Sequence, residues 1–222
     1  KIKLMDKVIF SQPWGGLGDN LSFSNLPKLY NEIDSNFYLS VLNNCRNKDI
    51  KEICWDNNSY VKKSQRLIPN IGYKTMLKNG FKLYNKKFNI IQNINILHGF
   101  DSGNGLPEIE LKDFQKSNIA KFELILDLNA SSLFSETNNS YNIKSLTESI
   151  NEFQSKKALD LIYPNIYTNK LPISNNANLE INSMSHLIDV LLLTDVFVCF
   201  NSGSHVLASA VKELTGRPNK II

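Results

Sequence analysis

The stretch that most constrains the fold of this chain lies close to its N-terminus and reads Trp14-Gly15-Gly16-Leu17-Gly18-Asp19-Asn20-Leu21. The apolar run Val8-Ile9-Phe10 precedes it and predicts a strand, and residues 21–30 follow with the apolar spacing of a helix. Glycines between a strand and a helix let the backbone approach a ligand, and they direct the free N–H groups of the helix towards it. The opening therefore predicts an α/β fold in which this turn borders a binding site.

The rest of the chain repeats the alternation of strand, polar loop and helix. Further strands are predicted at 36–42, 50–55, 90–97, 122–128, 158–163 and 195–200. Further helices are predicted at 73–88, 143–153, 184–193 and 205–214. Such alternation is typical of a parallel sheet with right-handed crossovers, and the turn formers of 101–107 mark a loop or domain boundary. We therefore expect two Rossmann-like α/β domains facing each other across a cleft, at 1–115 and 116–222.

Composition restricts the class of protein. A hydrophobic fraction of 42% and a charged fraction of 21% are ordinary for a soluble globular chain, and no apolar run could span a membrane. A formal net charge of +4 permits anionic ligands but is too small to indicate nucleic acid. The three scattered cysteines and the polar start, which does not resemble a secretory signal, predict a reducing, cytoplasmic location.

Residues 73–88 carry the clearest amphipathic pattern. Lysines recur every four residues on one face, at Lys74, Lys78, Lys82 and Lys86. A solvated charged face explains them, and peripheral contact with an anionic membrane surface is the alternative.

Several familiar motifs are absent from the sequence. Gly15-Gly16-Leu17-Gly18 does not have the G-x-G-x-x-G spacing of a dinucleotide site, and no Walker lysine follows it. There is no H-E-x-x-H and no D-x-D pair, so the sequence does not require a metal-bridged diphosphate site. We expect no metal ligand and no resident cofactor.

A second junction of strand, loop and helix occurs at Asn201-Ser202-Gly203-Ser204-His205. Backbone N–H groups and hydroxyls at a helix N-terminus suit a phosphate or diphosphate. Plain N-capping by Ser202 or Ser204 explains the same residue types. The residues alone leave both interpretations open.

The second junction also resembles a known family. Met184-Ser185, then Thr194-Asp195-Val196-Phe197-Val198-Cys199, then the Asn201 junction continuing to Val206-Leu207-Ala208, are similar to the donor-site segment of the ADP-heptose:lipopolysaccharide heptosyltransferases. These are bacterial glycosyltransferases of family 9. Gly18-Asp19-Asn20-Leu21 resembles their N-terminal Gly-Asp motif, and Asn129-Ala130-Ser131-Ser132 falls where they place a loop that touches the donor diphosphate.

The resemblance implies a GT-B fold, here unusually short, and an inverting transfer of a sugar, with heptose as one candidate, from a nucleotide diphosphate donor. The acceptor would be a glycan or glycolipid of lipopolysaccharide or capsule biosynthesis, reached in the cytoplasm or at the inner membrane. Asp19 would be the catalytic base, and protein donors around the leaving diphosphate would make a metal dispensable. The implied donor-binding residues are Asn129, Ser131, Ser132, Asn201, Ser202, Gly203, Ser204 and His205. The residues of the acceptor-side loop are Trp14, Gly16, Gly18, Asn20 and His98.

Alternatives remain beside this hypothesis. Without the resemblance, Asp19 is better explained as a first-turn carboxylate that caps its helix, and His98 equally well as a hydrogen-bonded structural histidine. The chain is short, and no lysine or arginine closely follows Ser132, so a non-catalytic module that binds a nucleotide sugar or glycan is a second reading. Gly15-Gly16-Leu17-Gly18 is also similar to the start of fucosyltransferase-like enzymes.

Overall fold

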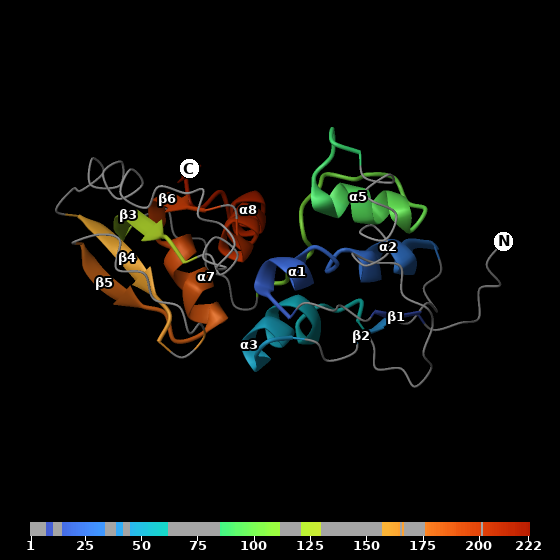
Figure 1. Ribbon diagram of the computed structural model, residues 1–222, viewed down its shortest axis with the longest axis horizontal. Coiled ribbons are helices and arrows are strands. Elements are labelled where there is room, and N and C mark those ends of the chain that lie inside the picture. Colours follow the sequence, from blue (N-terminus) through green and yellow to red (C-terminus); the bar gives the residue numbers. More distant parts are fainter. Residues whose placement is uncertain are drawn as a thin grey trace, which may run out of the picture. The chain divides into compact units, whose positions relative to one another are not determined.

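The computed structural model of the chain describes residues 8–10, 15–33, 39–41, 45–61, 85–111, 121–129, 157–164, 166, 176–200 and 202–222. The chain divides into two compact units, unit 1 (Lys1–Asp113) and unit 2 (Phe114–Ile222), whose elements are labelled in Figure 1. The helix predicted at 143–153 lies outside the described residues. So does the helix predicted at 73–88, apart from 85–88, which form a turn.

Unit 2 is built on a five-stranded parallel sheet with the strand order β5-β4-β3-β6-β7. Its strands are β3 (Phe122–Asp127), β4 (Ala158–Ile162), β5 (Ala177–Glu180), β6 (Thr194–Cys199) and β7 (Lys220–Ile221). Two helices accompany the sheet, α7 (Met184–Leu192) and α8 (Gly203–Thr215), and they lie next to it in Figure 1. The predicted α/β fold with a parallel sheet is confirmed here. The strands predicted at 122–128, 158–163 and 195–200 and the helices predicted at 184–193 and 205–214 are observed within a few residues.

The core of unit 2 consists of apolar side chains from the central strands and the two helices. Ile125 of β3 and Phe197 of β6 are fully buried, as are Leu187 of α7 and Leu207 of α8. The sequence does not predict the two edge strands, because β5 is mostly exposed and polar and β7 has only two residues. The central strands are therefore packed in the core of unit 2, and the two edge strands face solvent.

Unit 1 contains a parallel pair of short strands, β1 (Val8–Phe10) and β2 (Leu39–Val41), with Val8 opposite Leu39. Its helices are α1 (Leu17–Leu21), α2 (Leu26–Ile33), α3 (Lys48–Lys51), the π-helical turn η1 (Glu52–Asp56) and α5 (Ile90–Leu97). β1 and β2 agree with two predicted strands, and the order of β1, glycine turn and α1 agrees with the predicted opening.

The strand predicted at 50–55 is wrong, because α3 and η1 occupy these residues. The side chain of Asn47 caps the helix by accepting a hydrogen bond from the Ile50 amide at 3.0 Å. Ile50, Ile53 and Cys54 are buried. Their spacing of three and four residues is helical, and it outweighs the alternation on which the prediction relied.

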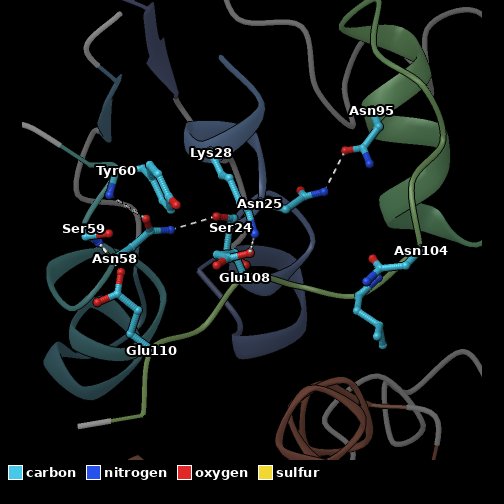
Figure 2. Close-up of polar contacts among 11 residues, drawn as sticks. Ser24, Asn25, Lys28, Asn58, Ser59, Tyr60, Asn95, Asn104, Glu108 and Glu110 are labelled. Carbon is cyan, nitrogen blue, oxygen red and sulfur yellow. Dashed lines mark hydrogen bonds and ion pairs between the residues drawn. The ribbon is translucent and has the colours of Figure 1, made fainter. Parts of the chain in front are cut away.

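The strand predicted at 90–97 is also wrong, because α5 occupies the whole segment. A capping box starts this helix: the Gln92 amide donates to Asn89 Oδ1 at 3.0 Å, and the Asn89 amide donates to Gln92 Oε1 at 3.0 Å. Inside the helix Asn95 is buried and accepts a hydrogen bond from Asn25 Nδ2 at 2.9 Å (Figure 2). The isoleucine-rich composition favours a strand, but the capping box of Asn89 and Gln92 stabilises a helix instead.

The helix predicted at 21–30 is interrupted by a turn at 22–25, so that α1 and α2 are separate. The Ser22 hydroxyl donates to the Gly18 carbonyl at 2.7 Å, and the Ser24 hydroxyl donates to the Leu21 carbonyl at 3.0 Å. Such side-chain bonds to the backbone compete with the helical ladder and favour a turn.

Charged side chains hold the segment 105–111, which contains no helix or strand, against the rest of unit 1 (Figure 2). Lys28 Nζ lies 3.1 Å from Glu108 Oε2, and the Ser59 amide donates to Glu110 Oε1 at 2.6 Å. These contacts join segments that are far apart in the sequence, so they fix the path of the chain as it leaves α5.

Gly216 ends α8 in the left-handed region, with φ of 81°, and its amide donates to the Lys212 carbonyl at 2.7 Å. A Cβ at this position would meet no atom within 4 Å, so a substitution acts on the backbone conformation alone. We expect Gly216→Ala to lower the free energy of unfolding by about 1 kcal/mol in urea titrations. Gly216→Asn is the control and should cost less, because Asn tolerates this conformation. Equal losses for the two variants would contradict this explanation.

Candidate functional site

The strand order of unit 2 defines a topological switch point at the carboxyl ends of its strands. From β3 the chain runs outward to β4 and β5 on one side, and it later returns to β6 and β7 on the other side. The connections therefore diverge between β3 and β6, and in open parallel sheets ligands bind outside the carboxyl ends of the strands at this switch point. Asp127 and Cys199, the last residues of β3 and β6, are opposite each other in the ladder. The switch point therefore lies beside Asp127.

Asp127 is the centre of a polar network at this edge. Its side chain is only 1% exposed. The Tyr163 hydroxyl donates to Oδ2 at 2.8 Å, and the Asn129 amide and Nδ2 donate to Oδ1 at 3.1 and 3.2 Å. Ser204, in the first turn of α8, also forms a side-chain hydrogen bond with the Asp127 carboxyl. The buried carboxyl thus joins the ends of β3 and β4 to the start of α8.

The start of α8 is only partly capped. Ser202 occupies the N-cap position with extended backbone, but its side chain makes no capping hydrogen bond. Instead its hydroxyl lies 2.8 Å from the hydroxyl of Ser204. Because the Ser202 side chain makes no hydrogen bond to the backbone amides of α8, plain N-capping does not explain this residue.

The electrostatics of the edge are dominated by the burial of ionisable groups. Burial raises the pKa of the Asp127 carboxyl, against the hydrogen bonds from Ser204, Tyr163 and Asn129, which lower this pKa. Burial and then the neighbouring charge of Asp127 raise the pKa of the Cys199 thiol to about 12. Cys199 is therefore a neutral thiol at physiological pH and not a nucleophile.

The structure brings some of the predicted donor-binding residues together. Asn129 and Ser204 form hydrogen bonds with Asp127, and the Ser202 hydroxyl contacts Ser204. Gly203 and His205 belong to the first turn of α8. Three further predicted residues lie outside the described residues, namely Ser131, Ser132 and Asn201.

Two residues of the network are not predicted from the sequence, Asp127 and Tyr163. A signal for Asp127 exists, because a carboxylate is the last residue of an otherwise apolar strand. Tyr163 directly follows β4, which ends beside β3. Since carboxyl ends of parallel strands meet at one edge, both could have been inferred from the strand assignment.

In unit 1, Asp19 is the third residue of α1, and Gly16 is its N-cap. The Asp19 carboxylate accepts a hydrogen bond from the Gly16 backbone, as in one half of a capping box. A Cβ at Gly16 would lie 2.8 Å from Asp19 Oδ2, so glycine is what allows this close approach. Burial raises the pKa of the Asp19 carboxyl, and the Gly16 hydrogen bond and the charge of Arg46 lower it by less.

Asn20, the next residue, organises the base of this turn. It is 1% exposed, its Nδ2 donates to the Gly16 carbonyl at 2.8 Å, and its Oδ1 accepts from Trp55 Nε1 at 2.8 Å. Cys45 Sγ donates to the same oxygen at 3.3 Å, and the Arg46 amide donates to the Gly15 carbonyl at 2.8 Å. These bonds hold the segment at 45–46 on the glycine turn and thereby place Arg46 beside Asp19.

The other residues predicted for the acceptor-side loop have different surroundings. Gly18 lies inside α1, and Trp14 lies outside the described residues. His98 ends α5, with its Nδ1 2.9 Å from the Tyr30 hydroxyl. This is the hydrogen bond expected of a structural histidine.

A shallow depression of about 580 Å³ lies at the amino ends of the unit 2 strands, opposite the ends that carry Asp127 and Cys199. Its lining comes from the amino ends of β3, β4 and β6: Lys121, Phe122, Glu123, Lys157, Leu159 and Asp195. Lys157 Nζ lies 2.6 Å from Glu123 Oε2, and Arg217 Nη1 lies 3.3 Å from Asp195 Oδ1. The charges that line the depression largely neutralise one another. The depression is therefore a poorer anion site than the carboxyl ends of the strands beside Asp127.

The described residues contain neither a membrane-spanning helix nor a metal-binding cluster. No described helix is both long enough and apolar enough to cross a membrane. In the same part of the chain, no three His, Cys, Asp or Glu side chains gather in a way that could hold a metal ion. Of the four predicted membrane-facing lysines, only Lys86 is described, and it is exposed in a turn.

Comparison with known proteins identifies the fold. No protein-family model matches the chain, and no curated protein matches it in sequence. It is similar to a bacterial iron-containing dodecameric glycosyltransferase, TibC from enterotoxigenic E. coli, with a TM-score of 0.60 and 14% identity over 93% of this chain and 58% of that chain. A second structure, of dodecameric iron-containing heptosyltransferase TibC in complex with ADP-D-beta-D-heptose, matches with a TM-score of 0.57 and 12% identity over 93% of this chain and 56% of that one.

This likeness shows a glycosyltransferase-like fold, which confirms the expected class of fold at that level. At 12–14% identity it shows the fold alone. The chain spans little more than half the length of TibC. Membership in family 9 and the arrangement of two domains across a cleft therefore stay predictions.

Proposed function

We propose that this chain is an inverting glycosyltransferase that transfers a sugar from a nucleotide diphosphate to a hydroxyl of a glycan or glycolipid. The observation that carries the proposal is the hydroxyl pair Ser202 and Ser204 at the switch point, beside Asp127 and Asn129, in a chain with a glycosyltransferase-like fold. In the proposal, unit 2 binds the donor and unit 1 provides the acceptor side.

The diphosphate of the donor would lie at the start of α8. The first-turn amides and the Ser202 hydroxyl are suited to its oxygens, and the helix dipole favours negative charge there by about 0.3–1 kcal/mol. Negative charge on the diphosphate grows as the bond to the sugar breaks, so the same donors stabilise the transition state. Ser131, Ser132 and Asn201 are proposed as additional contacts. With these donors the transfer would need no metal.

Asp19 is the proposed general base. The acceptor oxygen attacks the anomeric carbon, the bond from that carbon to the diphosphate breaks, and the acceptor proton passes to the Asp19 carboxylate. A half-buried carboxylate whose pKa is raised by burial is suited to accept this proton. Its hydrogen bond with Gly16 fixes the orientation of the carboxylate.

Sugar and pathway are further proposals. One TibC structure contains ADP-D-beta-D-heptose, which makes an adenine nucleotide and a heptose the first donor to test. Lipopolysaccharide or capsule biosynthesis in the cytoplasm, with the lysines of 73–88 on the inner membrane, would fit such an acceptor. A different sugar, as in a fucosyltransferase-like enzyme, would leave the rest of the proposal unchanged.

A second candidate function is a non-catalytic module that binds a nucleotide sugar. The hydrogen bond from Gly16 to Asp19 favours it, because a carboxylate that caps α1 has a structural reason to be present. The two candidates share the site in unit 2 and differ at Asp19 alone.

A panel of nucleotides read by thermal shift tests the proposed donor site. We expect one or more of ADP, UDP, GDP, CDP and dTDP to raise the melting temperature by several degrees, since a ligand at a hundredfold over its Kd stabilises by about 2.7 kcal/mol. The matching monophosphates should act more weakly, because they lack the second phosphate. The double variant Ser202→Ala/Ser204→Ala should lose the shift. A panel without any shift would contradict the donor site.

A further inference from the structure

The two hydroxyls at the start of α8 form a chain that ends on a buried carboxyl. Ser204 bonds to Asp127 with its side chain, and the Ser202 hydroxyl lies 2.8 Å from the Ser204 hydroxyl. Each hydroxyl has a single hydrogen, so it can donate to one neighbour of the chain only. The direction of the whole chain is therefore set at Asp127.

Ionisation of Asp127 fixes one direction of the chain, and protonation permits the opposite one. An ionised carboxylate only accepts, so Ser204 donates to Asp127, Ser202 donates to Ser204, and the outer Ser202 oxygen is left as an acceptor. A protonated carboxyl can donate to Ser204, which then donates to Ser202 and frees the Ser202 hydrogen for an outside acceptor. Phosphate oxygens accept hydrogen bonds, so only the second direction suits a nucleotide.

We propose that the protonation state of Asp127 sets the direction of the Ser204–Ser202 chain, so that binding of a nucleoside diphosphate at the start of α8 is accompanied by uptake of one proton from solvent by Asp127. This proposal rests on the proposed function and adds proton linkage to its donor site. Asp127 does not touch the nucleotide and is a positioning residue, which acts through Ser204 and Ser202.

The surroundings of Asp127 favour such a linkage. Burial disfavours the charged carboxylate, and a bound anion nearby would disfavour it further. Opposing this, Tyr163 from the end of β4 and Asn129 donate hydrogen bonds to the carboxylate. Among the described residues, Cys199 on β6 is a neutral thiol whose pKa the charge of Asp127 raises further, and His205 follows Ser204 on α8.

Calorimetry of ADP, or of the diphosphate that gives the largest thermal shift, tests the linkage. The titration is run between pH 5 and pH 9 in buffers of different ionisation enthalpy, which counts the protons taken up. The nucleotide also titrates, but its contribution is the same for every variant. We expect the wild type to bind more weakly as pH rises and to take up more protons than Asp127→Asn. The amide of that variant is uncharged and can donate, so we expect it to bind about tenfold more tightly than the wild type at pH 8.

Two further variants test whether the proton binds at Asp127. Tyr163→Phe removes a donor to the carboxylate and should move the loss of affinity to higher pH, without creating a charge. His186→Gln, on α7 of the same unit, should leave the proton count unchanged. Far-UV circular dichroism checks that each variant is folded.

The outcomes separate the linkage from the function on which it rests. If the diphosphate binds but Asp127→Asn takes up as many protons as the wild type, or Tyr163→Phe has no effect on the pH dependence, the linkage is wrong and the donor site stands. If His205→Gln takes up as many protons as the double variant His205→Gln/Asp127→Asn, the proton belongs to His205 and the linkage is also wrong. Absence of binding by every variant at every pH would overturn the linkage together with the proposed function.

Discussion

Replacing Asp19 by Asn is expected to leave the Kd of the nucleotide unchanged and to lower kcat by about 10²–10⁴-fold, the usual contribution of a general base. The amide oxygen of the variant can still accept the hydrogen bond from Gly16, so α1 should keep its cap. The measurement is the release of nucleoside diphosphate from the nucleotide sugar in the presence of a glycan acceptor. Asp49→Asn is the matched control, because Asp49 is also in the first turn of a short helix of unit 1, and its activity should equal that of the wild type.

The pH dependence gives a second readout of Asp19. A base must be ionised, so activity is lost as pH falls through its pKa. Because burial raises the pKa of Asp19, the acid limb of kcat/KM should lie above the ordinary value of 3.8. Arg46→Gln removes a charge that lowers this pKa, and it should move the limb to higher pH. An Asp19→Asn variant that transfers sugar at the wild-type rate would instead favour a structural cap.

Replacing Phe197 by Ala is expected to lower the free energy of unfolding of unit 2 by about 3–5 kcal/mol, through lost apolar contacts and the remaining cavity. Phe197 is 0% exposed and lies on β6, between β3 and β7. The measurement is urea denaturation followed by far-UV circular dichroism. Trp14 and Trp55 are both in unit 1, so tryptophan fluorescence follows that unit in the same samples.

Leu214→Ala is the control for Phe197, because Leu214 belongs to α8 of the same unit and is 56% exposed. We expect a change within about 0.5 kcal/mol for this variant. A loss at Phe197 no larger than that at Leu214 would contradict the packing of β6 in the core of unit 2.

Sequence alone predicts most of unit 2, since its central strands are short apolar runs and each is bounded by polar loops. The apolar run Thr194–Cys199, followed by Ser202 and Gly203, is typical of a strand, a polar loop and the start of a helix. Edge strands such as β5 do not have this signal, because an edge strand faces solvent and requires no apolar run.

Unit 1 was harder to predict because polar side chains decide its structure. Asn47 and Asn89 start helices in segments whose isoleucines suggested strands. Ser22 and Ser24 end a helix where the apolar spacing continued. In each case a side-chain bond to the backbone outweighs the weaker preference of β-branched residues.

The sequence indicates only part of the network around Asp127. It indicates Ser202 and Ser204 as candidates because glycine and hydroxyl residues follow an apolar strand. Asp127 and Tyr163 were missed because their importance depends on strand order, which periodicity does not contain. Only when β3 is known to lie between β4 and β6 do these residues share an edge.

A nucleoside diphosphate is expected to bind at the carboxyl ends of the strands of unit 2. Backbone amide NMR signals of the full chain, followed during titration with ADP or with the diphosphate selected by thermal shift, locate the site. We expect the largest shifts at Asn129 and at residues 202–205. Shifts confined to Lys121, Lys157 and Asp195 at the amino ends of the strands, or to unit 1, would contradict binding at the start of α8.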